Sequence, residues 1–234
     1  MAEPGIFTSS TFDLIGMNNH IPDEPLALFG GTFDPVHYGH LRCADEARQK
    51  LNLHQLYLLP AGIPVHRATP QASAGQRLEM LQLAQTEFPS LAIDSRELRR
   101  GGPSYMVDTL QELRSEFPHR SLLLLIGQDA ANRLHTWHLW EQLFLLTNLV
   151  ILTRPGEAAD YRHDLARQIQ SRMVTQEQEL AGSEHGCVLQ LQVSPIDISA
   201  TTIQSVMRLG RSPKSMLPAA VMDYIDENRL YLPV

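Results

Sequence analysis

The stretch from residue 26 to residue 41 constrains the fold of this 234-residue chain more than any other. It opens with four apolar residues and two glycines, Leu26–Gly31, a pattern typical of a short buried strand that ends in a turn. His37 and His40 follow, and apolar residues at helical spacing then predict a helix that begins near Tyr38. Both histidines therefore belong to a helix N-terminus. Backbone N–H groups and the helix dipole favour an anion there, above all a phosphate.

Short apolar runs recur along the chain and predict further strands at residues 55–60, 91–94, 122–127, 148–153 and 187–193. Helices are expected between and after them, from Ser73, from Ser104 to Phe117, over a segment with Trp137 and Trp140, and from Ser199. We expect a doubly wound parallel α/β sheet of five or six strands with helices on both faces. The most hydrophobic run, 122–127, should lie near its centre. Ligands in such sheets bind at the carboxyl ends of the strands.

Composition bounds the remaining possibilities. With 43% hydrophobic and 19% charged residues the chain is typical of a globular protein. A formal net charge of −7 argues against nucleic-acid binding, and no apolar run is long enough to span a membrane. Two cysteines without a common spacing fit a reducing cytoplasm. We expect a loose tail over residues 1–24 and a single domain over 25–234, present as a monomer or a small homo-oligomer.

The run Gly30-Gly31-Thr32-Phe33-Asp34-Pro35, followed by His37-x-Gly39-His40, resembles the signature of nucleotidyltransferases with a histidine-x-glycine-histidine loop. The form is that of bacterial nicotinate-nucleotide adenylyltransferases, and the similarity extends over roughly residues 26–232. It implies that ATP and nicotinate mononucleotide react to give nicotinate adenine dinucleotide and pyrophosphate, in NAD synthesis. It also implies Mg²⁺ held by the ATP phosphates rather than by side chains.

The resemblance assigns roles to individual residues. His37 and His40 would be the catalytic pair, because imidazole donors stabilise charge on a phosphoryl group. ATP and its phosphates would contact Gly30, Gly31, Thr32, Phe33, Arg67, Gly127, Ser199, Thr201 and Thr202. The mononucleotide would contact Ser104, Tyr105, Met106, Asp129, Trp137, His138 and Arg154.

Several assignments have a structural alternative at this stage. Arg67 could be a solvated loop arginine, Asp129 a helix cap, and Trp137 a packing residue. Met106 replaces the threonine that is usual in the family, which matters only if that position contributes a hydroxyl. Gln204 replaces an arginine, so either Arg208 reaches the phosphates or the neutral amide hydrogen-bonds there.

Two other functions stay open. Asp34, His37 and His40 could form a metal triad in a hydrolase. A pyridine-nucleotide-binding regulator without catalysis is the alternative suggested by Gln204.

Overall fold

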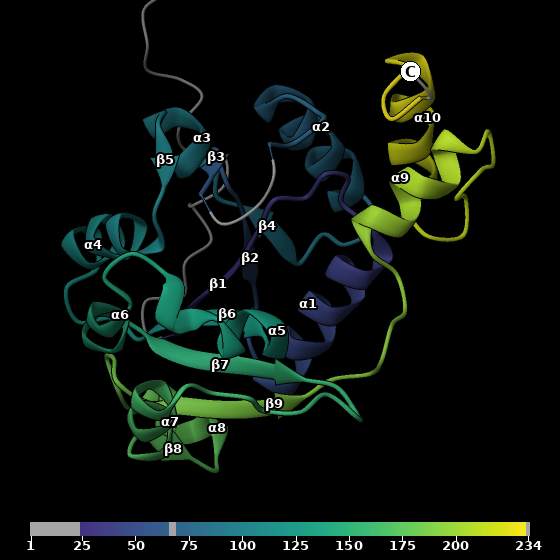
Figure 1. The fold of residues 1–234 in the computed structure, drawn as a ribbon. Helices are drawn as coiled ribbons and strands as arrows, with labels where there is room; N and C mark the ends of the chain where they lie inside the picture. Colours follow the sequence, from purple (N-terminus) through teal and green to yellow (C-terminus); the bar gives the residue numbers. More distant parts are fainter. Residues whose placement is uncertain (1–23, 66–68, 233–234) are drawn as a thin grey trace, which may run out of the picture.

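Seven parallel strands form the main sheet in the computed structural model, which describes residues 24–65 and 69–232 (Figure 1). Their spatial order is β4, β2, β1, β6, β7, β9, β8, with bounds Leu91–Ile93, Leu56–Pro60, Leu26–Gly31, Leu122–Gly127, Asn148–Thr153, Val188–Gln192 and Met173–Val174. β6 is the central strand, as its run of leucines predicted. The order reverses between β1 and β6, and this switch point is where doubly wound sheets open a crevice at the carboxyl ends of their strands.

The expected number of five or six strands is wrong. The additional strand is β8, which lies in the polar segment 157–182 and pairs with β9 at the edge of the sheet. A separate two-stranded sheet joins β3, Ile63–Pro64, to β5, Pro103–Ser104. All three of these strands have two residues, which is too short for hydrophobic alternation to reveal them.

Helices cover both faces of the main sheet, as expected (Figure 1). Ala27, Leu123 and Leu125 face a hydrophobic cluster shared with α1, α2, α9 and α10, which span Tyr38–Lys50, Ala74–Gln85, Ala200–Arg208 and Ala219–Glu227. Leu26 and Leu28 face the other cluster, shared with α4, α5, α6 and α7 at Met106–Glu116, Gln128–Asn132, Trp140–Leu146 and His163–Gln170. The alternation of side chains along each strand thus builds two cores from one sheet.

The helix starts follow the sequence signals closely. Ser73 caps α2 through a capping box with Gln76, and the Ser199 side chain accepts a hydrogen bond from the Thr202 N–H at the start of α9. His37 occupies the N-cap position of α1 without a side-chain cap bond.

One local expectation is wrong. Trp137 and His138 precede α6 instead of lying on it, because Leu139 adopts a left-handed conformation, with a φ of 49°, between the 3₁₀ helix η1, Leu134–Thr136, and α6. Residues Arg96–Arg100 form the short helix α3. The last short helix, α8, spans Glu177–Ala181.

The expectation of a loose tail over residues 1–24 falls almost wholly outside the described residues. Within residues 24–65 and 69–232, no helix is long and apolar enough to cross a membrane.

Candidate active site

The two histidines lie together at the carboxyl end of β1, where the chain turns into α1. Their rings are stacked with centroids 3.7 Å apart, and the Phe33 ring meets the His40 ring edge-on at 5.0 Å. His37 is buried, and its Nδ1 has no hydrogen-bond partner among the described residues. Burial, with a smaller contribution from the positive charge of Arg154, lowers the pKa of His37 to about 4. The imidazole of His37 is therefore neutral at pH 7.

Gly39 lets the start of α9 approach the start of α1. A Cβ at this position would lie 2.8 Å from the Ile198 carbonyl oxygen and 2.8 Å from His37 Nδ1, so a larger residue would force the two segments apart. Ser199, next in the chain after Ile198, is exposed, as are Thr201 and Thr202. The structure thus places the hydroxyl-rich start of α9 beside the histidine loop.

The carboxylate of Asp34 collects donors from distant segments. It accepts hydrogen bonds from the backbone N–H groups of Gln71 at 2.8 Å and Ala72 at 3.1 Å, and from the Tyr231 hydroxyl at 2.6 Å. Gln204 Nε2 donates to the Asp34 carbonyl oxygen at 2.7 Å, while its Oε1 accepts from Gln71 Nε2 at 2.5 Å. We call these five residues the Asp34 cluster. The Gln204 amide is therefore engaged by Asp34 and Gln71, and both expectations for the phosphates, Arg208 or this amide, stay predictions.

The metal-triad alternative fits this geometry poorly. Each oxygen of the Asp34 carboxylate already accepts two hydrogen bonds, so a metal ion could bind it only by replacing one of them. Within the described ranges, no group of three or more His, Cys, Asp or Glu side chains is arranged to hold a metal ion.

Arg77 holds two of the strand-end loops together. Only 1% of this α2 residue is exposed, and its guanidinium donates to the carbonyl oxygens of Thr32 at 2.8 Å, Ala61 at 2.7 Å and Gly62 at 3.0 Å. Thr32 follows β1 and the other two residues follow β2. A single buried cation therefore fixes the spacing of these loops at the switch point.

The start of α4 lies beside the end of β1. Met106 Cε lies 3.2 Å from the position that a Cβ on Gly30 would take, which places Met106 over this glycine. Tyr105 contacts His138, with ring centroids 4.5 Å apart. Ser104 Oγ accepts a hydrogen bond from the Gly62 N–H at 2.8 Å, so this hydroxyl links the two-stranded sheet to the loop after β2.

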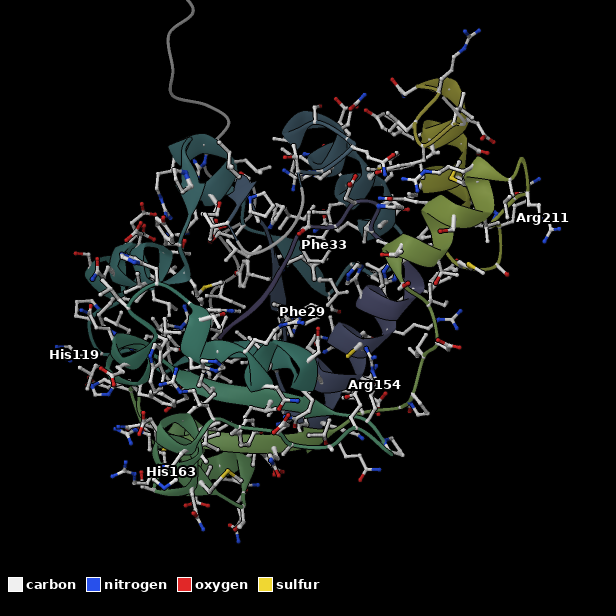
Figure 2. All side chains as sticks on the ribbon, viewed as in Figure 1. Phe29, Phe33, His119, Arg154, His163 and Arg211 are labelled. Carbon is white, nitrogen blue, oxygen red and sulfur yellow. The ribbon has the colours of Figure 1, made fainter. Side chains whose placement is uncertain are left out.

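The ends of β6 and β7 supply the remaining candidates. A Cβ on Gly127 would lie 2.8 Å from Asp129 Oδ1, so the exposed carboxylate stands directly over the end of β6. It does not cap α5, because the N-cap residue is Gly127. Figure 2 shows Phe33 near the end of β1 and Arg154 beside α1. Arg154 is half-buried and pairs weakly with Glu157 at 3.4 Å.

Trp137 is half-buried and packs against the cluster that covers α4 and α6. Gly31, like Gly30, ends β1. Arg67 lies outside the described residues, so the structure does not place it.

Sequence analysis missed three residues that organise the site: Arg77, Tyr231 and Gln71. For Arg77 a signal existed, because it shares the buried face of α2 with Met80, Leu81 and Ala84. Tyr231 lies 197 residues from its partner Asp34, and no local pattern reports such a contact.

Comparison with known proteins agrees with the geometry. The cytidylyltransferase-like family matches residues 28–206. A probable nicotinate-nucleotide adenylyltransferase of Methylococcus capsulatus is 44% identical over 207 residues, which cover 88% of this chain and 99% of the relative. One from Halorhodospira halophila is also 44% identical, with 90% and 96% covered. The chain belongs to the nicotinate-nucleotide adenylyltransferase family.

Solved structures share the fold at low sequence identity. The nicotinic acid mononucleotide adenylyltransferase of Plasmodium falciparum, complexed with NaAD, superposes with a TM-score of 0.67 at 13% identity and covers 89% of this chain and 97% of its own. A putative nicotinate-nucleotide adenylyltransferase of Vibrio parahaemolyticus gives a TM-score of 0.59 at 12% identity, with 89% and 95% covered. The doubly wound arrangement is thus that of known adenylyltransferases.

Proposed function

We propose that this protein transfers the adenylyl group of ATP to nicotinate mononucleotide, giving nicotinate adenine dinucleotide and pyrophosphate in NAD synthesis. The observation that carries the proposal is the stacked pair His37 and His40 at the N-terminus of α1, at the switch point of the sheet. Backbone donors, a helix dipole and two imidazoles meet at one place there, which suits phosphoryl charge. Membership of the nicotinate-nucleotide adenylyltransferase family supports the same substrates.

In the reaction, a 5′-phosphate oxygen of the mononucleotide forms a bond to the α-phosphorus of ATP, and the bond to the β-phosphate oxygen breaks in line. No covalent enzyme intermediate is needed, so the residues act by positioning and by stabilising charge. His37 and His40 donate hydrogen bonds to the transferring and leaving phosphates. Because His37 is neutral at pH 7, it donates without carrying a desolvated charge of its own.

The triphosphate would extend from the end of β1, at Gly30, Gly31, Thr32 and Phe33, toward the start of α9, where Ser199, Thr201 and Thr202 offer hydroxyl donors; Arg67 and Gly127 complete this proposed ATP site. Mg²⁺ would arrive with ATP, held by its phosphates, and would neutralise part of their charge. This fits the chain, since the Asp34 carboxylate is engaged by hydrogen bonds.

The mononucleotide would occupy the opposite side, between the starts of α4 and α6. Tyr105 and Met106 would present backbone N–H groups to the nicotinate carboxylate, and Trp137 would stack on its ring. Ser104, Asp129, His138 and Arg154 complete this side, with Asp129 suited to ribose hydroxyls at the end of β6. We further propose that residues 25–234 act as one domain, because Ala27 and Tyr231 share one hydrophobic cluster. Two cysteines without a common spacing support a location in the cytoplasm.

The test is turnover of the purified protein with ATP, Mg²⁺ and either nicotinate or nicotinamide mononucleotide. We expect strong preference for nicotinate, since a donor-only pocket suits a carboxylate. His40→Ala should lower kcat on the order of 10²–10³-fold, the usual loss for one electrostatic donor. His119→Ala is the matched control: its side chain is 90% exposed and far from the sheet switch point (Figure 2). Absence of turnover, or a fully active His40→Ala variant, would contradict the proposal.

A further inference from the structure

Tyr231 is placed in a way that local structure does not explain. It follows α10 near the C-terminus, and its side chain is only 5% exposed. Its φ is 60°, in the left-handed region that bulky residues disfavour. Such a conformation persists only when surrounding contacts hold it in place, and it often accompanies a functional constraint. The shortest of the contacts described for Tyr231 is the 2.6 Å hydrogen bond from its hydroxyl to Asp34 Oδ1.

Asp34 connects Tyr231 to the proposed catalytic histidines. It lies three residues before His37, in the connection between β1 and α1. Its carboxylate is also held by backbone N–H groups ahead of α2, and its carbonyl oxygen by Gln204 of α9. Three parts of the chain, distant in sequence, therefore fasten the residue that precedes the catalytic turn.

Both ends of the same loop are held independently of the Asp34 cluster. Arg77 binds the carbonyl oxygen of Thr32, and the Tyr38 N–H donates to the carbonyl oxygen of Met216 at 2.9 Å. Between these two anchors, the Asp34 cluster provides the hydrogen bonds of the middle of the loop. A change at Tyr231 can therefore alter the loop locally without releasing its ends.

We propose that Tyr231 is a positioning residue for adenylyl transfer: its hydroxyl fixes Asp34 and thereby the loop that presents His37 and His40. The proposal rests on the function proposed above. It assigns to the segment after α10 an indirect part in the reaction, through the contact with Asp34. Because small displacements of a catalytic group lower the rate steeply, the effect should fall on kcat rather than on substrate binding.

The test compares Tyr231→Phe with Tyr57→Phe. Both tyrosines are buried, and each donates one hydrogen bond, Tyr57 to Gln55 Oε1 at 2.8 Å near the amino end of β2. Tyr231→Phe should lower kcat by about tenfold, with both KM values within about threefold, because a bond to a charged acceptor is lost. Tyr57→Phe should leave kcat within about twofold. An unchanged kcat in Tyr231→Phe, or equal losses in both variants, overturns the proposal.

The route through Asp34 is tested by a double-mutant cycle. In an Asp34→Ala background, Tyr231→Phe should change kcat by less than about twofold, because the acceptor is already gone. An undiminished tenfold loss there would show that Tyr231 acts elsewhere.

A second readout does not depend on activity or on the folding of Asp34→Ala. Histidine ring ¹H–¹⁵N spectra of the wild type and Tyr231→Phe should differ at His37 and His40 and agree at His119. Unchanged ring signals would overturn the proposal. If the wild type shows no turnover at all, the proposed function fails, while these spectra still decide whether Tyr231 positions the loop.

Discussion

At the scale of single residues, the environment of His37 determines what it can do. Its ring is 4% exposed and stacked on His40, with the cation of Arg154 close enough to disfavour protonation. An imidazolium would be more strongly hydrated in water than at this position, so the neutral form is selected. The same burial that suits the residue to donate a hydrogen bond also makes the protein sensitive to acid.

This sensitivity gives a prediction about stability. The pKa of His37 is about 4 in the folded state and 6.5 as its ordinary value. Between these pH values the unfolded chain binds the additional proton, so the free energy of unfolding falls as the pH is lowered from 6.5 toward 4. The decrease due to His37 approaches about 3 kcal/mol at the acid end. Urea unfolding of wild type and His37→Gln at pH 7 and pH 4.5 measures it.

His37→Gln should lose distinctly less stability over that range than the wild type. His119→Gln, at an exposed site, should behave as the wild type does. Identical pH dependence in His37→Gln and wild type would mean that His37 is not buried as a neutral ring.

At the scale of elements, the candidate active site is formed where strand ends and helix starts come together, and a few side chains fix their relative positions. Arg77 of α2 joins the loops after β1 and β2 through three carbonyl oxygens. Met106 at the start of α4 closes over Gly30 at the end of β1. Each contact crosses between elements, so the site depends on their relative placement more than on any one loop.

Replacing Arg77 by methionine should therefore be costly. Three partly buried carbonyl oxygens would each lose a charged donor, and a group left without a partner costs about 1–3 kcal/mol. We expect the free energy of unfolding to fall by roughly 3–5 kcal/mol, with kcat lowered as well. Arg167→Met, at an exposed site where the guanidinium pairs with Asp164 of α7, should change stability by less than about 0.5 kcal/mol. Denaturant titration of both variants checks this, and equal stability would refute the role of Arg77.

The connection between η1 and α6 carries a second prediction. Trp137 and Trp140 are both half-buried and contact the same hydrophobic cluster, but Trp140 packs edge-on against Phe144, with ring centroids 6.2 Å apart. Trp137→Ala should weaken mononucleotide binding by roughly 1–3 kcal/mol, if base–aromatic stacking is a fair guide, and leave ATP binding nearly unchanged. Trp140→Ala should lower stability only. Dissociation constants for ATP and for the mononucleotide, measured by calorimetry, distinguish the two variants. Equal weakening of the binding of both ligands by Trp137→Ala would indicate a packing role.

At the scale of the whole molecule, the sequence predicted those features that depend on neighbouring residues. The start of α1 follows from the helical spacing of apolar residues after Tyr38, and the starts of α2 and α9 follow from caps at Ser73 and Ser199, because both signals act within a few residues. The central position of β6 follows from its continuous apolar run.

Features set by contacts distant in sequence could not be predicted in this way. β8 is an edge strand only because β9 lies beside it, and its two residues carry no period of their own. The contact between Tyr231 and Asp34 depends on how α10 packs, which no pattern near either residue encodes. Leu139 delays the start of α6 to Trp140 through a backbone conformation that its side chain does not signal.

Ligand binding should stabilise the molecule as a whole, and the rise in Tm should depend on whether the pyridine ring carries a carboxylate or an amide. Nicotinate adenine dinucleotide at about 100 times its dissociation constant raises the free energy of unfolding by about 2.7 kcal/mol. For a chain of this size that corresponds to a rise in Tm of about 5–10 °C. Nicotinamide adenine dinucleotide carries an amide, which a donor-only pocket near Tyr105 and Met106 would leave partly unsatisfied. If it binds about 100-fold more weakly, the same concentration should raise Tm by only about 1 °C. Thermal unfolding with each dinucleotide measures the difference, and equal shifts would show that the pocket does not distinguish acid from amide.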